Sequence, residues 1–143
     1  MAFTFQVTID ASDPYRLASF WAEVLGYELQ PPPDGYDTWE SFAVANQIPE
    51  DDWDKYSALV DPAGEGPRIF IQRVPEPKTA KNRVHLDVNA GAGSEDPHQR
   101  RLAVSDTAER LAQLGATRLG EFDEYGSHWI VMQDPEGNEF CVH

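Results

Sequence analysis

Apolar residues follow a helical pattern in "SDPYRLASFWAEVLGYEL", residues 12–29. Five apolar residues recur at the spacing of one face of an α-helix: Leu17, Phe20, Trp21, Val24 and Leu25. Ser12 or Asp13 can cap the start of this helix, and Pro14 fits a first turn that does not need its N–H. Gly26 can end the helix in the left-handed conformation. The pattern therefore predicts an amphipathic helix.

A second helix is expected in "SDTAERLAQLGATRL", residues 105–119. Its apolar face would consist of Ala108, Leu111, Ala112 and Leu114. Asp106 and Glu109 have the spacing of a weak capping signal, and Gly115 can end the helix. The residues before it, around "GAGSEDPHQRRL", carry charges of both signs, and we interpret them as an insertion of about a dozen residues exposed in a loop.

Both halves of the chain end in a hairpin-like pattern. Two apolar stretches flank Asp-Pro-X-Gly at residues 61–64 and again at residues 134–137. We expect "WESFAVA" and "ATRLGEF" to supply the remaining strand of each half. The chain thus repeats the order β-α-β-β-β in two modules, at about residues 1–75 and 82–143, joined by "VPEPKTAKN".

The stretch "KNRVHLDV", residues 81–88, alternates as a strand does. Its apolar row would be Val84, Leu86 and Val88, and its polar row would be Arg83, His85 and Asp87. Three ionisable groups of different kinds on one side of a strand mark a candidate binding or catalytic surface.

Composition narrows the functional classes. The chain has 143 residues, the length of one domain, and a formal net charge of −14. This charge disfavours nucleic-acid and membrane partners and would attract a cationic ligand. The single cysteine, Cys141, excludes an intrachain disulfide. The start "MAFTFQVTID" lacks the pattern of a signal peptide, so we expect a cytoplasmic protein.

The repeated modules and the stretches "NRVHLDV" and "VMQDPEGNEFCV" resemble the vicinal oxygen chelate superfamily, which includes glyoxalase I, extradiol dioxygenases and bleomycin-resistance proteins. The resemblance covers most of the chain. It implies a single α+β domain, residues 1–143, in which two tandem β-α-β-β-β modules form a curved eight-stranded mixed sheet. It also implies a homodimer and a small-molecule ligand in a cavity between the modules.

The resemblance also locates the positions that hold a metal in the metal-dependent members. Here these positions are Gln6, Gln72, Arg83 and Cys141, and none is the usual His or Glu. A guanidinium cannot deprotonate to become a ligand. We therefore predict no cofactor, and a divalent metal is disfavoured, although a relocated site on His85 and Glu139 stays open. The register at Gln72 is also open, because Ile69 and Ile71 could be the inward row instead.

The predicted site combines polar residues of both modules. His85 and Glu139 are the candidate acid/base pair, with a buried, structural histidine as the alternative for His85. Arg83 is a candidate substrate anchor or a member of an ion pair, and Cys141 is a candidate thiol or a small buried residue. The remaining candidate ligand-binding residues are Gln6, Thr8, Gln72 and Trp39.

Three functional classes remain. The first is a glyoxalase-like lyase or isomerase that works without a metal. The second is a non-catalytic protein that binds a drug or metabolite, as bleomycin-resistance proteins do, and the third is an interaction domain without ligand chemistry. A fold hosts many functions, so the fold alone does not choose among them.

Overall fold

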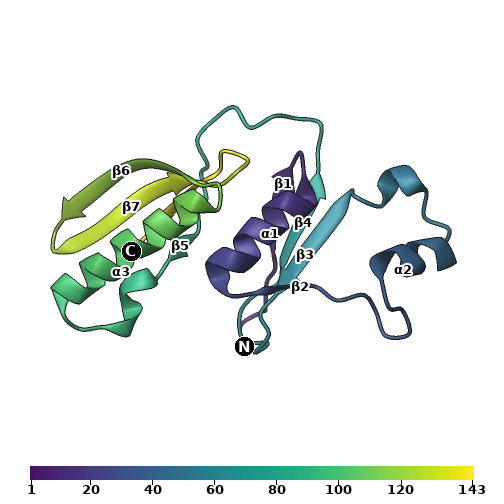
Figure 1. Ribbon diagram of the computed structural model, residues 1–143, viewed down its shortest axis with the longest axis horizontal. Coiled ribbons are helices and arrows are strands. Elements are labelled where there is room, and N and C mark those ends of the chain that lie inside the picture. Colours follow the sequence, from purple (N-terminus) through teal and green to yellow (C-terminus); the bar gives the residue numbers. More distant parts are fainter. The chain divides into compact units, whose positions relative to one another are not determined.

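Eight strands lie in two four-stranded mixed sheets, one in each half of the chain. The computed structural model describes residues 1–143, which divide into the units Met1–Pro77 and Lys78–His143. The first sheet has the strand order β1-β4-β3-β2 and the second has the order β5-β8-β7-β6 (Figure 1). In each, the outer pair β1–β4 or β5–β8 is parallel and the other pairs are antiparallel. The matching topology confirms the two predicted modules.

The first unit contains β1 (Val7–Ala11), α1 (Pro14–Leu25), β2 (Glu28–Leu29), α2 (Trp39–Ala45), the short 3₁₀ helix η1 (Glu50–Asp52), β3 (Tyr56–Val60) and β4 (Ile69–Arg73). The second contains β5 (Asp87–Val88), the 3₁₀ helix η2 (Ala90–Gly93), α3 (Pro97–Gln113), β6 (Thr117–Glu124), β7 (Ser127–Gln133) and β8 (Glu139–Val142). None of these helices combines the length and the apolar character needed to span a membrane.

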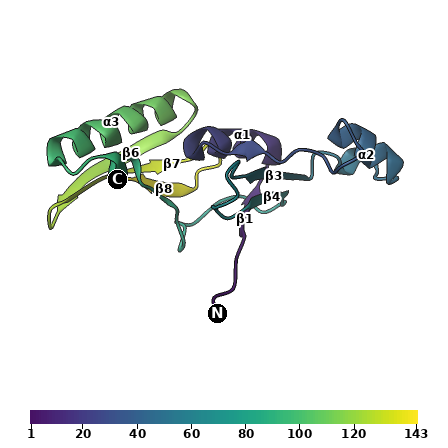
Figure 2. The ribbon, with the colours of Figure 1, turned by 90° about the horizontal axis from the view of Figure 1, so that it is seen from below.

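The first predicted helix is confirmed as α1. Asp13 caps it, because its Oδ1 accepts a hydrogen bond from the Arg16 backbone N–H at 3.1 Å, and Gly26 ends it with a φ of 68°. The helix lies on one face of the first sheet (Figure 2). Its fully buried residues Leu17 and Trp21 form a core with three sheet residues, Leu59, Ile69 and Ile71. The opposite face of this sheet carries no helix.

The second helix begins earlier than the sequence predicted. α3 starts at Pro97, and Asp96 caps it by accepting the His98 backbone N–H at 3.0 Å. Part of the expected loop insertion is therefore the first turns of the helix, and η2 precedes them. Asp96 and Pro97 repeat the capping pattern of α1, but the charged residues that follow hid the helical period. Only Val104, Ala108 and Leu111 of α3 are buried, so most of its surface is polar.

The prediction of a strand at "WESFAVA" was wrong, because residues 39–45 form the helix α2. Thr38 and Ser41 form a reciprocal capping box at its start, with the Ser41 N–H donating to Thr38 Oγ1 at 3.0 Å. The fourth strand of the first sheet is instead the two-residue β2, just after α1. "ATRLGEF" was correctly predicted, since it begins β6.

The predicted strand of residues 81–88 is much shorter in the structure. Only Asp87 and Val88 belong to β5, although the Cys141 N–H also donates to the Leu86 carbonyl at 3.1 Å. Val84, assigned to the apolar row, is 84% exposed. The segment before Leu86 does not pair with β8, so the alternation there does not bury a face.

The two Asp-Pro-X-Gly turns are confirmed and are organised by their aspartates. The Asp61 carboxylate accepts the backbone N–H groups of Ala63, Glu65 and Gly66 at 2.8–3.1 Å. These hydrogen bonds, mainly that of Gly66, lower the pKa of Asp61. In the second turn, Asp134 is only 3% exposed and accepts the N–H groups of Glu136 and Asn138.

Candidate functional site

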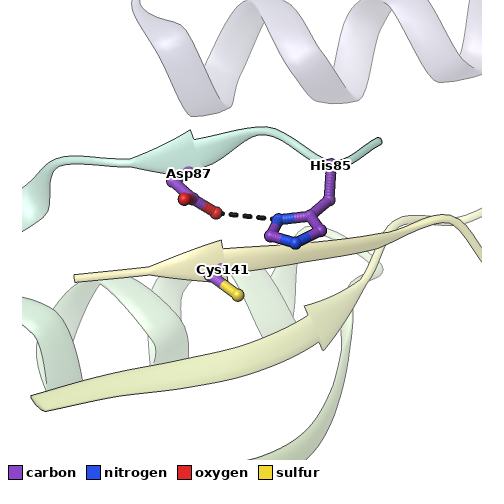
Figure 3. Close-up of side chains that lie close together, drawn as sticks. All are labelled: His85, Asp87 and Cys141. Atoms are coloured by element: carbon purple, nitrogen blue, oxygen red, sulfur yellow. Dashed lines mark hydrogen bonds and ion pairs between the residues drawn. The ribbon is translucent and has the colours of Figure 1, made fainter. Parts of the chain in front are cut away.

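The open face of the second sheet carries His85 and Asp87, two of the three ionisable residues predicted from "KNRVHLDV". Phe140 and Val142 of β8 are buried beneath α3, so the alternate residue Cys141 faces away from the helix. Asp87 lies opposite Cys141 in the parallel pair β5–β8. His85, two residues before Asp87, extends over the same face, as Figure 3 shows.

His85, Asp87 and Cys141 form one cluster (Figure 3). His85 Nδ1 lies 2.9 Å from Asp87 Oδ1, and one donor atom of each of the three residues lies within 4.8 Å of the others. The side chains of His85 and Asp87 are 39% and 48% exposed, so a solute can reach them. With a neutral imidazole, the Asp87 carboxylate can accept a proton only from Nδ1–H. This pairing leaves Nε2 as a proton acceptor.

Cys141 is a half-buried thiol in this cluster. Burial, and secondarily the negative charge of Asp87, raises its pKa. The thiol therefore remains protonated at neutral pH, which does not favour a thiolate nucleophile. Its role in the cluster is that of a neutral neighbour of Asp87, unless a bound cation displaces its proton.

Glu139 has different partners from those the predicted acid/base pair requires. Its Oε2 accepts the backbone N–H of Asn82 at 2.9 Å and lies 3.1 Å from Lys78 Nζ. No hydrogen bond joins it to His85. The Asn82 hydrogen bond first, and the nearby Lys78 ammonium as a further cause, lower the pKa of Glu139 to about 2. Glu139 thus stays ionised and ties the segment that leads into His85 to β8.

The other predicted residue of this unit, Arg83, is exposed and makes no ion pair. Phe122 and Trp129 form an aromatic pair that was not among the predicted site residues, and their rings stack 5.7 Å apart at an interplanar angle of 18°. Trp129 lies two residues from Val131, which is opposite Cys141, so it faces the same side of the sheet. The alternation of β7 around the buried residue Ile130 was the signal that could have placed it.

In the first unit, Gln6, Thr8 and Gln72 lie on the open sheet face. Gln72 is opposite Asp10 in the β1–β4 pair and donates to Asp10 Oδ1 at 2.8 Å. Ile69 and Ile71 are buried against α1, which settles the register in favour of Gln72. Gln6 donates weakly to Thr8 Oγ1, at 3.4 Å.

Trp39, the last predicted ligand-binding residue, lies on a helix and not on a sheet strand. It belongs to α2, is 45% exposed, and donates from Nε1 to the Gln30 carbonyl oxygen at 2.9 Å. Its ring meets that of Phe42 edge to face, with 5.6 Å between centroids. These contacts hold the start of α2 to the end of the β2 segment.

The four positions that the resemblance assigned to a metal do not fit one here. The amides of Gln6 and Gln72 are engaged by neighbouring side chains, and Arg83 offers only a cation. The cluster of His85, Asp87 and Cys141 is different, because it offers nitrogen, oxygen and sulfur donors, a set suited to Zn²⁺. Two of its members, His85 and Asp87, lie outside the four positions.

Comparisons with known proteins agree with this fold. The sequence matches the family of glyoxalase-like domains over residues 6–143. No match was found among curated proteins. Among solved structures, a glyoxalase/bleomycin resistance protein/dioxygenase family enzyme from Burkholderia phytofirmans PsJN is 18% identical, with a TM-score of 0.58 over 96% of this chain and 94% of that one.

The fosfomycin resistance protein FosX from Listeria monocytogenes, in complex with Mn(II) and 1S,2S-dihydroxypropylphosphonic acid, is 13% identical, with a TM-score of 0.63. The match covers 100% of this chain and 90% of that one. At such identities the similarity shows the fold alone. The family match spans nearly the whole chain and includes both modules. The chain therefore belongs to the glyoxalase-like domain family of the vicinal oxygen chelate superfamily.

Proposed function

We propose that this chain is a lyase or isomerase for a small oxygenated substrate, with His85 as the group that moves a proton. The observation that carries the proposal is the 2.9 Å contact between His85 Nδ1 and Asp87 Oδ1 on an accessible sheet face. A carboxylate at Nδ1 orients the imidazole and sets its tautomer. It therefore fixes the ring with Nδ1–H toward Asp87 and leaves the lone pair of Nε2 free to accept a proton.

The proton transfer needs only these two side chains. Nε2 of His85 takes a proton from a carbon next to the substrate carbonyl, and the electron pair of the broken C–H bond moves into the carbonyl to give an enolate. The imidazolium keeps its Nδ1–H donated to Asp87. Returning the proton to a different atom completes an isomerisation, whereas expelling a leaving group from the adjacent carbon completes an elimination.

Residues near His85 would contribute to substrate binding and hold the preceding segment in place. The stacked rings of Phe122 and Trp129 offer an apolar surface on the same sheet face. Glu139 fixes the segment from Lys78 to Asn82, and so limits the freedom of the chain that leads into His85. A divalent cation held by His85, Asp87 and Cys141 would supply Lewis-acid polarisation of a substrate oxygen.

The second candidate function is binding without turnover. Each unit has a stacked aromatic pair on its open sheet face, Phe122–Trp129 in one and Tyr56–Phe70 in the other. Aromatic surfaces on a chain with a net charge of −14 suit a flat, cationic drug or metabolite. We also expect a homodimer, which light scattering of the purified chain tests directly.

Proton exchange provides a test that does not require the natural substrate. Pyruvate and dihydroxyacetone are incubated with the protein in deuterated water, and loss of the C–H signal is followed by NMR. We expect exchange above the buffer rate, falling by about 100-fold or more in His85→Ala. The matched control is His98→Ala, which removes an exposed histidine of α3.

The outcomes separate the candidates. Equal exchange in the wild type and His85→Ala would refute the role of His85. Exchange at the buffer rate for both compounds, together with saturable binding of a flat cation such as ethidium that is weakened in Trp129→Ala, would favour the binding protein. In Asp87→Asn, we expect slower exchange and a changed pH profile, because the amide can donate to Nδ1 and reverse the tautomer.

A further inference from the structure

We propose that Arg68 forms a binding site for an oxyanion, the carboxylate or phosphate group of a small ligand, on the open face of the first sheet. Arg68 directly precedes β4, and its carbonyl accepts the Val7 N–H at 3.1 Å. Since Ile69 and Ile71 point into the core, the alternate residues Arg68 and Phe70 lie on the open face. The site is built from residues of the first unit only, and the proposal does not depend on the function of the His85 cluster.

The guanidinium of Arg68 is held in place by neutral groups. Its Nε donates to Gln30 Oε1 at 2.6 Å, and its Nη1 donates to Gln6 Oε1 at 2.8 Å. Nη2 has no partner. A guanidinium has five N–H donors in one plane, so the Nη1–Nη2 edge keeps donors for both oxygens of a carboxylate or phosphate. The two amides therefore orient the group and leave its binding edge open.

Arg68 is a half-buried cation without a carboxylate partner, whereas the other arginines that form no ion pair, such as Arg83, are exposed. The chain has 25 acidic residues and only 11 lysines and arginines. Three other arginines, Arg73, Arg101 and Arg118, form ion pairs with Asp or Glu. Arg68 forms none, although it is half-buried. A positive charge that the protein orients without neutralising it favours an external anion.

Aromatic rings complete the site. The Arg68 guanidinium carbon lies 5.1 Å from the centre of the Phe70 ring, and that ring stacks on Tyr56 at 5.3 Å. The ammonium of Lys55 lies 5.6 Å from the Tyr56 ring, which places a second cation beside the pair. Tyr56 is 52% exposed. The patch formed by Lys55, Tyr56, Arg68 and Phe70 thus suits an anionic group attached to a flat ring.

The alternative is that Arg68 has a structural role alone and only links Gln6 to Gln30. Titrating the full-length chain with small anions distinguishes the two roles. Benzoate, phenyl phosphate and inorganic phosphate test the carboxylate, the aryl phosphate and the free anion, and benzamide is the uncharged control. We expect saturable calorimetric binding of at least one anion and none of benzamide. In Arg68→Gln, the affinity should fall by about tenfold or more. Arg16→Gln, which makes the same charge change on the exposed side of α1, should bind as the wild type does.

A second measurement needs no variant. Adding the anion to isotopically labelled wild-type protein should shift the NMR signals of the Arg68 Nε–H and of the Gln6 and Gln30 side-chain amides. Anion binding that leaves these signals unchanged, equal affinity in Arg68→Gln and Arg16→Gln, or benzamide binding as strong as benzoate binding would each overturn the proposal. If none of the three anions binds, the proposal is overturned as well, and the role of Arg68 is the structural link between Gln6 and Gln30.

Discussion

Glu139 provides a direct test of how one carboxylate stabilises the second unit. Its side chain is 13% exposed, and it accepts the Asn82 backbone N–H while pairing with Lys78. Replacement by Gln keeps the size and one oxygen acceptor but removes the charge. The Asn82 hydrogen bond then becomes a neutral one, and the Lys78 ammonium loses its partner. We expect Glu139→Gln to fold and to be less stable than the wild type at neutral pH.

The magnitude follows from the lowered pKa. The pKa of Glu139 falls from an ordinary value of 4.5 to about 2, mainly because the Asn82 N–H favours the ionised form. Since one pKa unit corresponds to about 1.4 kcal/mol, the ionised carboxylate stabilises the folded chain by about 3 kcal/mol. A depressed pKa means that this stability is fully present above pH 4.5 and is lost as the pH falls toward 2.

Urea unfolding followed by circular dichroism at several pH values between 7 and 3 measures the effect. The difference in unfolding free energy between the wild type and Glu139→Gln should be about 2–3 kcal/mol at pH 7 and shrink steadily below pH 4.5. Glu109→Gln is the matched control, because Glu109 is an exposed residue of α3 and its replacement makes the same charge change. A difference that stays constant with pH, or that Glu109→Gln reproduces, would refute the electrostatic account.

Three further outcomes test other parts of the structure. Asp134→Ala should lower the unfolding free energy by about 2–4 kcal/mol in urea, since it leaves the Glu136 and Asn138 N–H groups unpaired, and Asp134→Asn should recover part of this loss. Cys141→Ser should weaken Zn²⁺ binding, measured by competition with a chromophoric chelator, by about tenfold or more; equal affinities would place any zinc elsewhere. Gly66→Ala should lower the melting temperature, because the new Cβ would lie 1.9 Å from Tyr27 Oη, whereas Gly93→Ala meets no atom within 4 Å and should not.

The parts of the fold that the sequence predicted well are those with local signals. α1 has its cap at Asp13, its stop at Gly26 and a continuous apolar face, so three independent patterns agree. The two turns begin with Asp61 and Asp134, each of which binds backbone N–H groups within five residues. Interactions this short in sequence can be predicted from the residues themselves.

The wrong assignments depended on contacts that are distant in sequence. Residues 39–45 contain aromatic and β-branched residues typical of strands, yet no strand lies beside them, and the Thr38–Ser41 capping box favours a helix. The strand expected at residues 81–88 shortened for a related reason. Its parallel partner β8 begins at Glu139, so in the register that sets Asp87 opposite Cys141 the residues up to Val84 have no strand residue beside them.

The candidate site around His85 shows the same difference between local patterns, which the sequence reveals, and distant contacts, which it does not. Alternation alone placed His85 and Asp87 in one row, and the structure joins them in one hydrogen bond. A contact between His85 and Glu139 would require β5 to pair with β8 as far back as His85. The pairing holds only at Asp87 and Val88, opposite Cys141 and Val142, and Glu139 instead accepts the Asn82 backbone N–H. The point at which the pairing begins, which no local pattern marks, thus decides that Glu139 anchors the preceding segment.

The two modules share a topology but not the chemistry of their open faces. In the first unit, Gln6 and Gln30 hold an arginine that no carboxylate neutralises, whereas the second sheet presents His85, Asp87 and Cys141. Both sets lie on the faces that α1 and α3 leave open, where a side chain can change without disturbing the core. Duplication of one stable module therefore leaves each sheet free to acquire its own polar residues. On this argument, anion binding at Arg68 and proton transfer at His85 can be removed separately, and a variant of one should leave the other measurable.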